Sequence, residues 1–96
     1  MSKMKIVFLE TDTLGDDVDL SKFDMFGEVT KYPNTTSLQV PERIKDADII
    51  IVNKLPMNEM TLSQADSLKL ICLTATGTNI VDFNYTNSRN ITVTNV

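Results

Sequence analysis

The sequence predicts an α/β protein built on a doubly wound parallel sheet of five strands in the order 2-1-3-4-5, which stops after its fifth strand. Three observations lead to this prediction. Short apolar and β-branched runs alternate with polar segments of helix length, as in successive βα units. Two of the runs, IIIV and LICL, are apolar at every position, which indicates strands covered on both faces. The connections are short, and right-handed crossovers then give a flavodoxin-like strand order.

The first part of the chain predicts two strands joined by a short helix. The first strand is expected at Lys5 to Leu9 (KIVFL). An acidic loop follows, after which Asp19 is placed to cap a helix over Leu20 to Phe26 that ends at Gly27. Glu28 to Tyr32 (EVTKY) alternates outward charge with inward side chains, as an edge strand does.

A second helix is expected between this edge strand and the centre of the sheet. Thr36 or Ser37 can cap it, and it should run to about Lys45 with Leu38 among the residues available for burial. Pro41 fits only if it lies in the first helical turn, because it has no backbone N–H to donate.

The remaining elements follow at short intervals. Ile49 to Val52 (IIIV) and Leu70 to Leu73 (LICL) are the central strands, separated by a helix that Thr61 caps and that continues to about Ser67. Asp82 to Ser88 predicts a short helix with Asp82 as its N-cap, and Ile91 to Thr94 (ITVT) is the fifth strand.

Composition excludes several classes of function. The 96 residues have room for one small domain, and nine basic against thirteen acidic side chains give a net charge of −4, which would repel nucleic acid. There is no histidine, so no histidine-based acid, base, triad or metal site exists in the chain. No apolar run reaches membrane length, and the cytoplasm is the expected location. Cys72, the only cysteine, is expected to be a small buried hydrophobe.

Ligands of an open parallel sheet bind beyond the carboxyl ends of its strands. The segments there are Glu10 to Asp12, Asn53 to Leu55, Thr74 to Asn79, and Asn95 with Val96. The strongest candidate is the loop after the fourth strand, TATGT, which contains Thr76 and Gly77. A glycine between small hydroxyl residues can turn backbone N–H groups toward a carboxylate or phosphate. A plain βα turn explains the same residues, and both interpretations stay open at this point.

Three known kinds of site do not match these loops. A flavodoxin phosphate loop resembles TATGT but follows the first strand, whereas TATGT follows the fourth. A dinucleotide fold needs G-x-G-x-x-G after the first strand, and the chain has only three, scattered glycines. A receiver domain needs an aspartate and a lysine where Asn53 and Asn95 stand. The acidic trio of Glu10, Asp12 and Asp16 is therefore interpreted as a solvated loop.

From Leu68 onward the sequence LKLICLTATGTNIVDFNYTNSRNITVTNV, with DADIIIVNK upstream, resembles the D-isomer-specific 2-hydroxyacid dehydrogenases. The likeness is strongest to the glycerate dehydrogenase and hydroxypyruvate reductase branch. The spacing of Gly77, Asn79 and Asp82 is the most specific part, and the likeness before residue 46 is weak.

The resemblance implies that residues 1–96 are the amino-terminal segment of the substrate-binding domain of a two-lobed oxidoreductase. It implies a small 2-oxo or D-2-hydroxy acid as substrate, of hydroxypyruvate or glyoxylate type, with the backbone at Thr76 and Gly77 receiving its carboxylate and Asn53, Lys54 and Leu55 lining the same cleft. NAD or NADP would serve the parent enzyme through a Rossmann domain that this chain lacks. The catalytic arginine, glutamate and histidine of the family would lie beyond Val96, so the chain should hold no catalytic residue and be inactive alone.

Two other hypotheses remain. The chain could be a free-standing flavodoxin-like module that binds a small anion or associates with itself through an uncovered sheet face, which would make it a homo-oligomer such as a dimer. A degenerate receiver-like signalling domain is the third.

Overall fold

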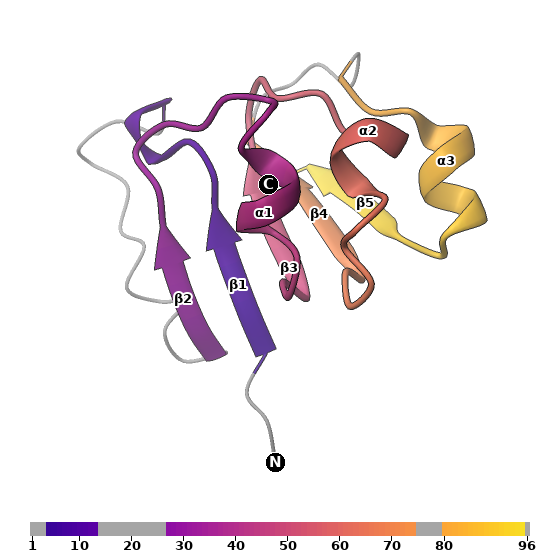
Figure 1. The fold of residues 1–96 in the computed structure, drawn as a ribbon, viewed down its shortest axis with the longest axis horizontal. Coiled ribbons are helices and arrows are strands. Elements are labelled where there is room, and N and C mark those ends of the chain that lie inside the picture. The colour runs from indigo at the N-terminus through magenta and orange to yellow at the C-terminus, as the bar shows by residue number, and fades with distance from the viewer. Residues whose placement is uncertain (1–3, 14–26, 75–79, 96) are drawn as a thin grey trace.

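The computed structural model describes residues 4–13, 27–74 and 80–95, and its centre is a parallel sheet of five strands (Figure 1). The strand order is 2-1-3-4-5, as the sequence predicts. All four pairings between neighbouring strands are parallel. The strands are β1 (Met4–Phe8), β2 (Gly27–Lys31), β3 (Ile49–Val52), β4 (Leu70–Leu73) and β5 (Thr92–Asn95).

Strand ends differ from the predicted ones by a single residue in three cases, because pairing with the neighbouring strand decides them. β1 and β2 each begin one residue early, at Met4 and Gly27, which pair with each other. The approach of the two backbones is very close there. A Cβ atom on Gly27 would lie 2.1 Å from the Met4 carbonyl oxygen, so only glycine fits this position.

Three short α-helices in the described part of the chain cover one face of the sheet (Figure 1). A 3-10 turn, η1 (Thr11–Thr13), follows β1. The helix expected over residues 20–26 lies outside the described residues. None of the described helices has the length and apolarity needed to cross a membrane. The α-helices are α1 (Val40–Arg43), α2 (Glu59–Leu62) and α3 (Phe83–Ser88).

The prediction for α1 was wrong in length and in the burial of Leu38. The segment that begins at Thr36 is a turn, in which the Gln39 N–H donates to the Thr36 carbonyl at 2.9 Å, and the helix itself is a single turn. Leu38 belongs to that turn and is 88% exposed. Pro41 lies in the first helical turn, as predicted.

The predicted cap of α2 was also wrong. The N-cap is Asn58, whose side chain accepts a hydrogen bond from the Thr61 N–H at 3.3 Å. Thr61 occupies the third helical position, and its hydroxyl accepts from the Asn58 N–H at 3.0 Å. The two residues thus form a capping box, and the helix ends after one turn. For α3 the predicted cap is confirmed, since an Asp82 carboxylate oxygen accepts from the Tyr85 N–H at 3.2 Å.

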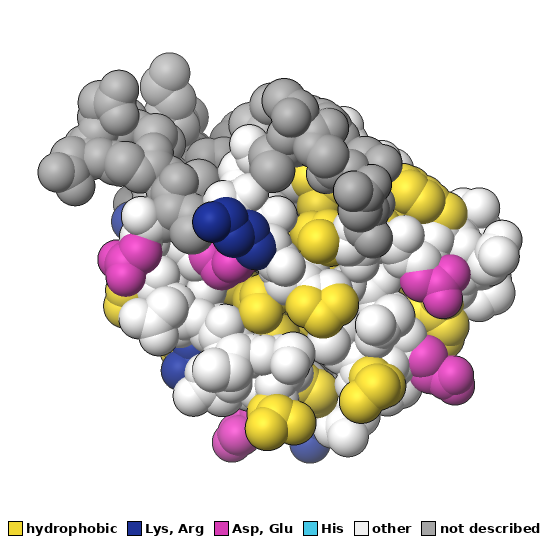
Figure 2. All heavy atoms as spheres, turned by 90° about the horizontal axis from the view of Figure 1, so that it is seen from above, with side chains coloured by type: hydrophobic (Ala, Val, Ile, Leu, Met, Phe, Trp, Pro, Cys, Tyr) yellow, Lys and Arg dark blue, Asp and Glu magenta, His cyan; other side chains and the backbone are white. Residues whose placement is uncertain are grey.

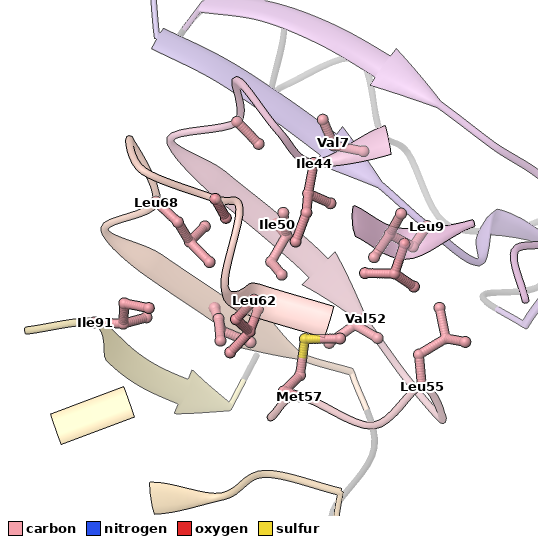
Figure 3. Packing of buried hydrophobic residues seen from close by; sticks show 14 of the residues in the cluster. Val7, Leu9, Ile44, Ile50, Val52, Leu55, Met57, Leu62, Leu68 and Ile91 are labelled. Atoms are coloured by element: carbon pink, nitrogen blue, oxygen red, sulfur yellow. The ribbon is translucent and has the colours of Figure 1, made fainter. Parts of the chain in front are cut away.

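The main hydrophobic core lies between the sheet and the three helices (Figure 3). Alternate strand residues face it, because successive side chains of a strand point to opposite faces. The other face carries a smaller cluster of Ile6, Phe8 and Ile51, with Cys72 packed against it. Cys72 is half-buried rather than fully buried, and burial raises the pKa of its thiol. The main cluster includes Val7, Leu9, Val40, Ile44, Ile50, Val52, Leu55, Met57, Leu62, Ile71 and Leu73.

Candidate functional site

The candidate site is the edge of the sheet at which the parallel strands end, because ligands of open α/β sheets bind there. Figure 2 views the molecule from this side, where hydrophobic side chains lie between a few separated charged ones. The described residues that follow the central strands are Leu9 and Glu10 after β1, Asn53 to Leu55 after β3, and Thr74 after β4.

A carboxylate at this edge joins two neighbouring strands. One oxygen of Glu10, Oε2, accepts hydrogen bonds from the backbone N–H groups of Asn53 at 2.6 Å and Lys54 at 2.8 Å. Glu10 itself is half-buried. The interpretation of this residue as part of a solvated acidic loop was therefore wrong. Its partners are backbone amides, which no residue type in the sequence would indicate.

The backbone on either side of Glu10 is fixed by both neighbouring strands. The Leu9 N–H donates to the Ile51 carbonyl of β3 at 3.1 Å, and the Thr11 N–H donates to the Tyr32 carbonyl beyond β2 at 3.0 Å. The Thr35 hydroxyl also donates to the Leu9 carbonyl at 2.7 Å. The chain thus extends the sheet past the end of β1, and this extension brings the Glu10 side chain to the end of β3.

The three predicted residues after β3 lie in different environments. Asn53 is half-buried and Lys54 is exposed, so both can meet a ligand at this edge. Leu55 is 8% exposed and packs in the main core close to Met57 (Figure 3). The Leu55 side chain therefore anchors the loop in the main core. The ammonium group of Lys54 is the cation that the loop exposes to solvent.

Thr76 and Gly77 lie outside the described residues, but the residues before and after them are both tied to the β3 segment. The Thr74 N–H donates to the Val52 carbonyl at 3.0 Å, and the Ile80 carbonyl accepts from the Met57 N–H at 2.7 Å. Met57 also forms a parallel bridge with Val81. Thr74 and Ile80 therefore both lie beside the segment of the chain that contains Asn53 and Lys54.

The described residues of this edge include no cluster of side chains suited to a metal ion. Within residues 4–13, 27–74 and 80–95 there is no group of three or more acidic, cysteine or histidine side chains that could hold a metal ion. Asp82 serves as the N-cap of α3, as predicted, and Arg89 at the other end of that helix forms an ion pair with Asp66 at 3.8 Å. Lys54 and Glu10 are charged residues at this part of the edge, and Asp12 in η1 lies two residues beyond Glu10.

Comparisons with known proteins agree with this geometry. Residues 6–96 match the family described as D-isomer specific 2-hydroxyacid dehydrogenase, catalytic domain. A protein of Haemophilus influenzae assigned to the 2-hydroxyacid dehydrogenases is 41% identical over 93 residues, which cover 97% of this chain and 30% of that protein. A glycerate dehydrogenase of Methylorubrum extorquens is 39% identical over 93 residues, which cover 96% of this chain and 29% of that enzyme.

A solved structure of a relative shares the fold. The NAD⁺-bound 3-phosphoglycerate dehydrogenase of Entamoeba histolytica superposes with a TM-score of 0.77 at 25% identity, over 98% of this chain and 33% of that one. The chain therefore spans about 30% of the length of the relatives that it matches. The resemblance inferred from TATGTNIVD and VTNV is confirmed at the level of the family.

Proposed function

Because this chain belongs to the D-isomer-specific 2-hydroxyacid dehydrogenase family, we propose that it is the amino-terminal segment of the substrate-binding domain of a cytoplasmic, NAD(P)-dependent oxidoreductase. The parent enzyme would interconvert 2-oxo acids of hydroxypyruvate or glyoxylate type and D-2-hydroxy acids. A hydroxypyruvate reductase of Blautia hydrogenotrophica, 34% identical over 97 residues, supports this choice of substrate class.

The observation that supports the proposal most is that Thr74 and Ile80, which flank the interval with Thr76 and Gly77, are both hydrogen-bonded to the chain around Asn53 and Lys54. Lys54 is exposed beside the end of β3. We propose that the backbone N–H groups of Thr76 and Gly77 receive the substrate carboxylate, as the family resemblance implies. Lys54 would attract the anion, and Asn53 and Leu55 would shape the wall of the cleft.

The described residues do not fit a nicotinamide dinucleotide. In dinucleotide folds the pyrophosphate lies at a glycine-rich turn after the first strand. Here that position holds the carboxylate of Glu10, followed by Asp12, and both would repel a pyrophosphate. We therefore assign NAD(P) binding to residues of the parent enzyme outside this chain. The catalytic groups are assigned there as well, so the 96 residues alone should show no turnover.

Binding of hydroxypyruvate to the ¹⁵N-labelled chain tests the proposal. We expect the backbone signals of Asn53, Lys54 and Leu55 to shift with hydroxypyruvate and to stay in place with glyceraldehyde, which has no carboxylate. The variant Lys54→Gln should weaken binding by about tenfold or less, as expected for one exposed charge. Lys69→Gln is the matched control, because Lys69 is exposed at the opposite end of the sheet, just before β4.

Two outcomes would count against the proposal. Equal shifts with hydroxypyruvate and glyceraldehyde would exclude carboxylate recognition. Shifts confined to the amino ends of the strands would place the ligand elsewhere. Oxidation of NADH by the chain with hydroxypyruvate would contradict the assignment of the catalytic groups to other residues, and would favour an autonomous enzyme.

We also propose self-association through the sheet face opposite the three helices, at the half-buried residues that border the buried cluster of Ile6, Phe8 and Ile51. Cys72 and Ile49 on the same face are only half-buried, which leaves apolar surface for a second copy to cover. Size-exclusion chromatography should show a homodimer, and a stable monomer over a wide range of concentration would contradict this part of the proposal.

A further inference from the structure

We propose that Glu10 is a positioning residue for the loop after β3: its carboxylate occupies an anion-binding nest made by the amides of Asn53 and Lys54, and keeps other anions out of it. This inference rests on the proposed function only in treating that loop as facing the substrate. The nest and its occupant are features of the fold.

The two amides form a nest because they are consecutive in the chain and converge on one atom. Both N–H groups donate to Oε2 of Glu10, at 2.6 Å and 2.8 Å. Both distances are shorter than the usual N–H···O separation of about 2.9–3.0 Å. Consecutive backbone N–H groups that point to one place bind phosphate or carboxylate groups in many proteins. Here the bound carboxylate belongs to the protein itself.

The occupant is held by its own backbone. Leu9 and Thr11, on either side of Glu10, donate backbone hydrogen bonds to Ile51 and Tyr32 respectively. The backbone of Glu10, 43 residues before Asn53 in the sequence, therefore holds the carboxylate at the nest. A tethered group has a high effective concentration at its site, so a dissolved carboxylate at millimolar concentration does not displace it.

Occupation of the nest determines what the loop offers to a substrate. With both amides bonded, the loop presents the Lys54 ammonium and the half-buried carboxamide of Asn53 instead of free N–H groups. The negative charge of Glu10 also repels a second anion from the nest. A substrate carboxylate is thereby kept off the Asn53 and Lys54 amides, while the Lys54 ammonium group still attracts it to this edge.

Chemical rescue with acetate tests the proposal. The ¹⁵N-labelled chain and its Glu10→Ala variant are titrated with sodium acetate, with sodium chloride as the ionic-strength control. In the wild type, where Glu10 already occupies the nest, acetate should move the Asn53 and Lys54 amide signals far less than in Glu10→Ala. In Glu10→Ala both signals should move on loss of the side chain, and acetate should return them saturably toward their wild-type positions. A merely structural side chain would not be replaced by a dissolved carboxylate.

Two further variants keep the test decisive if Glu10→Ala unfolds. Glu10→Gln keeps the shape and a neutral acceptor, and hydrogen exchange at the Asn53 and Lys54 amides should accelerate by about tenfold or more, since hydrogen bonds to charged groups are the stronger ones. Glu28→Gln, an exposed glutamate on the edge strand β2, is the matched control and should leave both amides unchanged.

Several results would overturn the inference. They are an acetate response of the wild-type amides equal to that of Glu10→Ala, no acetate response in a folded Glu10→Ala, or unchanged exchange in Glu10→Gln. Its failure is distinguishable from failure of the proposed function. If acetate rescues Glu10→Ala while hydroxypyruvate shifts no signal of the wild type, the role of Glu10 in the nest is supported and the proposed substrate is contradicted. If hydroxypyruvate binds to the wild type and acetate does not rescue Glu10→Ala, the proposed substrate is supported and the role of Glu10 is contradicted.

Discussion

Truncation of Ile50 to alanine should remove a large part of the stability of this domain. Ile50 lies in the middle of β3, is fully buried, and packs in the main core beneath α1 and α2. The substitution deletes three side-chain carbons, and at about 0.8 kcal/mol each the lost transfer free energy is about 2.4 kcal/mol. The unfilled cavity adds to this, so we expect a total of about 3–4 kcal/mol.

Such a loss is severe for a chain of this size. At about 0.05–0.15 kcal/mol per residue, the free energy of unfolding of a small domain of 96 residues is about 5–14 kcal/mol. Urea unfolding followed by far-ultraviolet circular dichroism measures the change, because the chain has no tryptophan to report fluorescence. Leu38→Ala, at an 88% exposed position, is the control and should change stability by no more than about 0.5 kcal/mol. A cost below about 1 kcal/mol for Ile50→Ala, at an unchanged dependence on urea, would refute the packing described for β3.

Three further predictions concern single positions. Gly27→Ala should destabilise the chain by about 1–3 kcal/mol in thermal unfolding, because the added Cβ meets the Met4 carbonyl at 2.1 Å; a neutral effect would mean that β1 and β2 are not so close. Asn58→Ala should cost about 1 kcal/mol through loss of the N-cap of α2, with Asn58→Ser close to neutral, and equal stability of both variants would show that the capping box contributes nothing. Cys72 should react slowly with iodoacetamide at neutral pH and faster only as the pH rises beyond the range of an ordinary thiol, because burial raises its pKa and the thiolate is the reactive form; rapid labelling at neutral pH would contradict its burial.

The central part of the fold could be predicted from the sequence because its signal is local. β3 and β4 coincide with the apolar runs IIIV and LICL, and a strand buried on both faces needs apolar residues at every position. The helices were harder, since several polar residues compete for each N-cap. Thr61 satisfies the sequence rule for a cap, yet Asn58, three residues earlier, takes that position and uses Thr61 as its partner.

The candidate site was predictable in part. The position of Asn53 and Lys54 at the carboxyl edge follows from strand order alone. The assignment of Thr76 and Gly77 to the site comes from the resemblance to the family and stays a prediction. The role of Glu10 did not follow from the sequence, because its hydrogen bonds run to backbone amides 43 and 44 residues away. Any residue type at those two positions other than proline provides an N–H group. The sequence therefore does not indicate that Glu10 bonds to these amides.

If this chain forms a working part of the substrate-binding domain of a D-2-hydroxyacid dehydrogenase, it should function inside a related enzyme. To test this, the matching 93-residue region of the Methylorubrum extorquens glycerate dehydrogenase is replaced with this chain, and oxidation of NADH by the chimera with hydroxypyruvate is followed. We expect turnover by the chimera that is lost when the chain is omitted. A chimera that folds and binds NADH, yet reduces no 2-oxo acid, would contradict it.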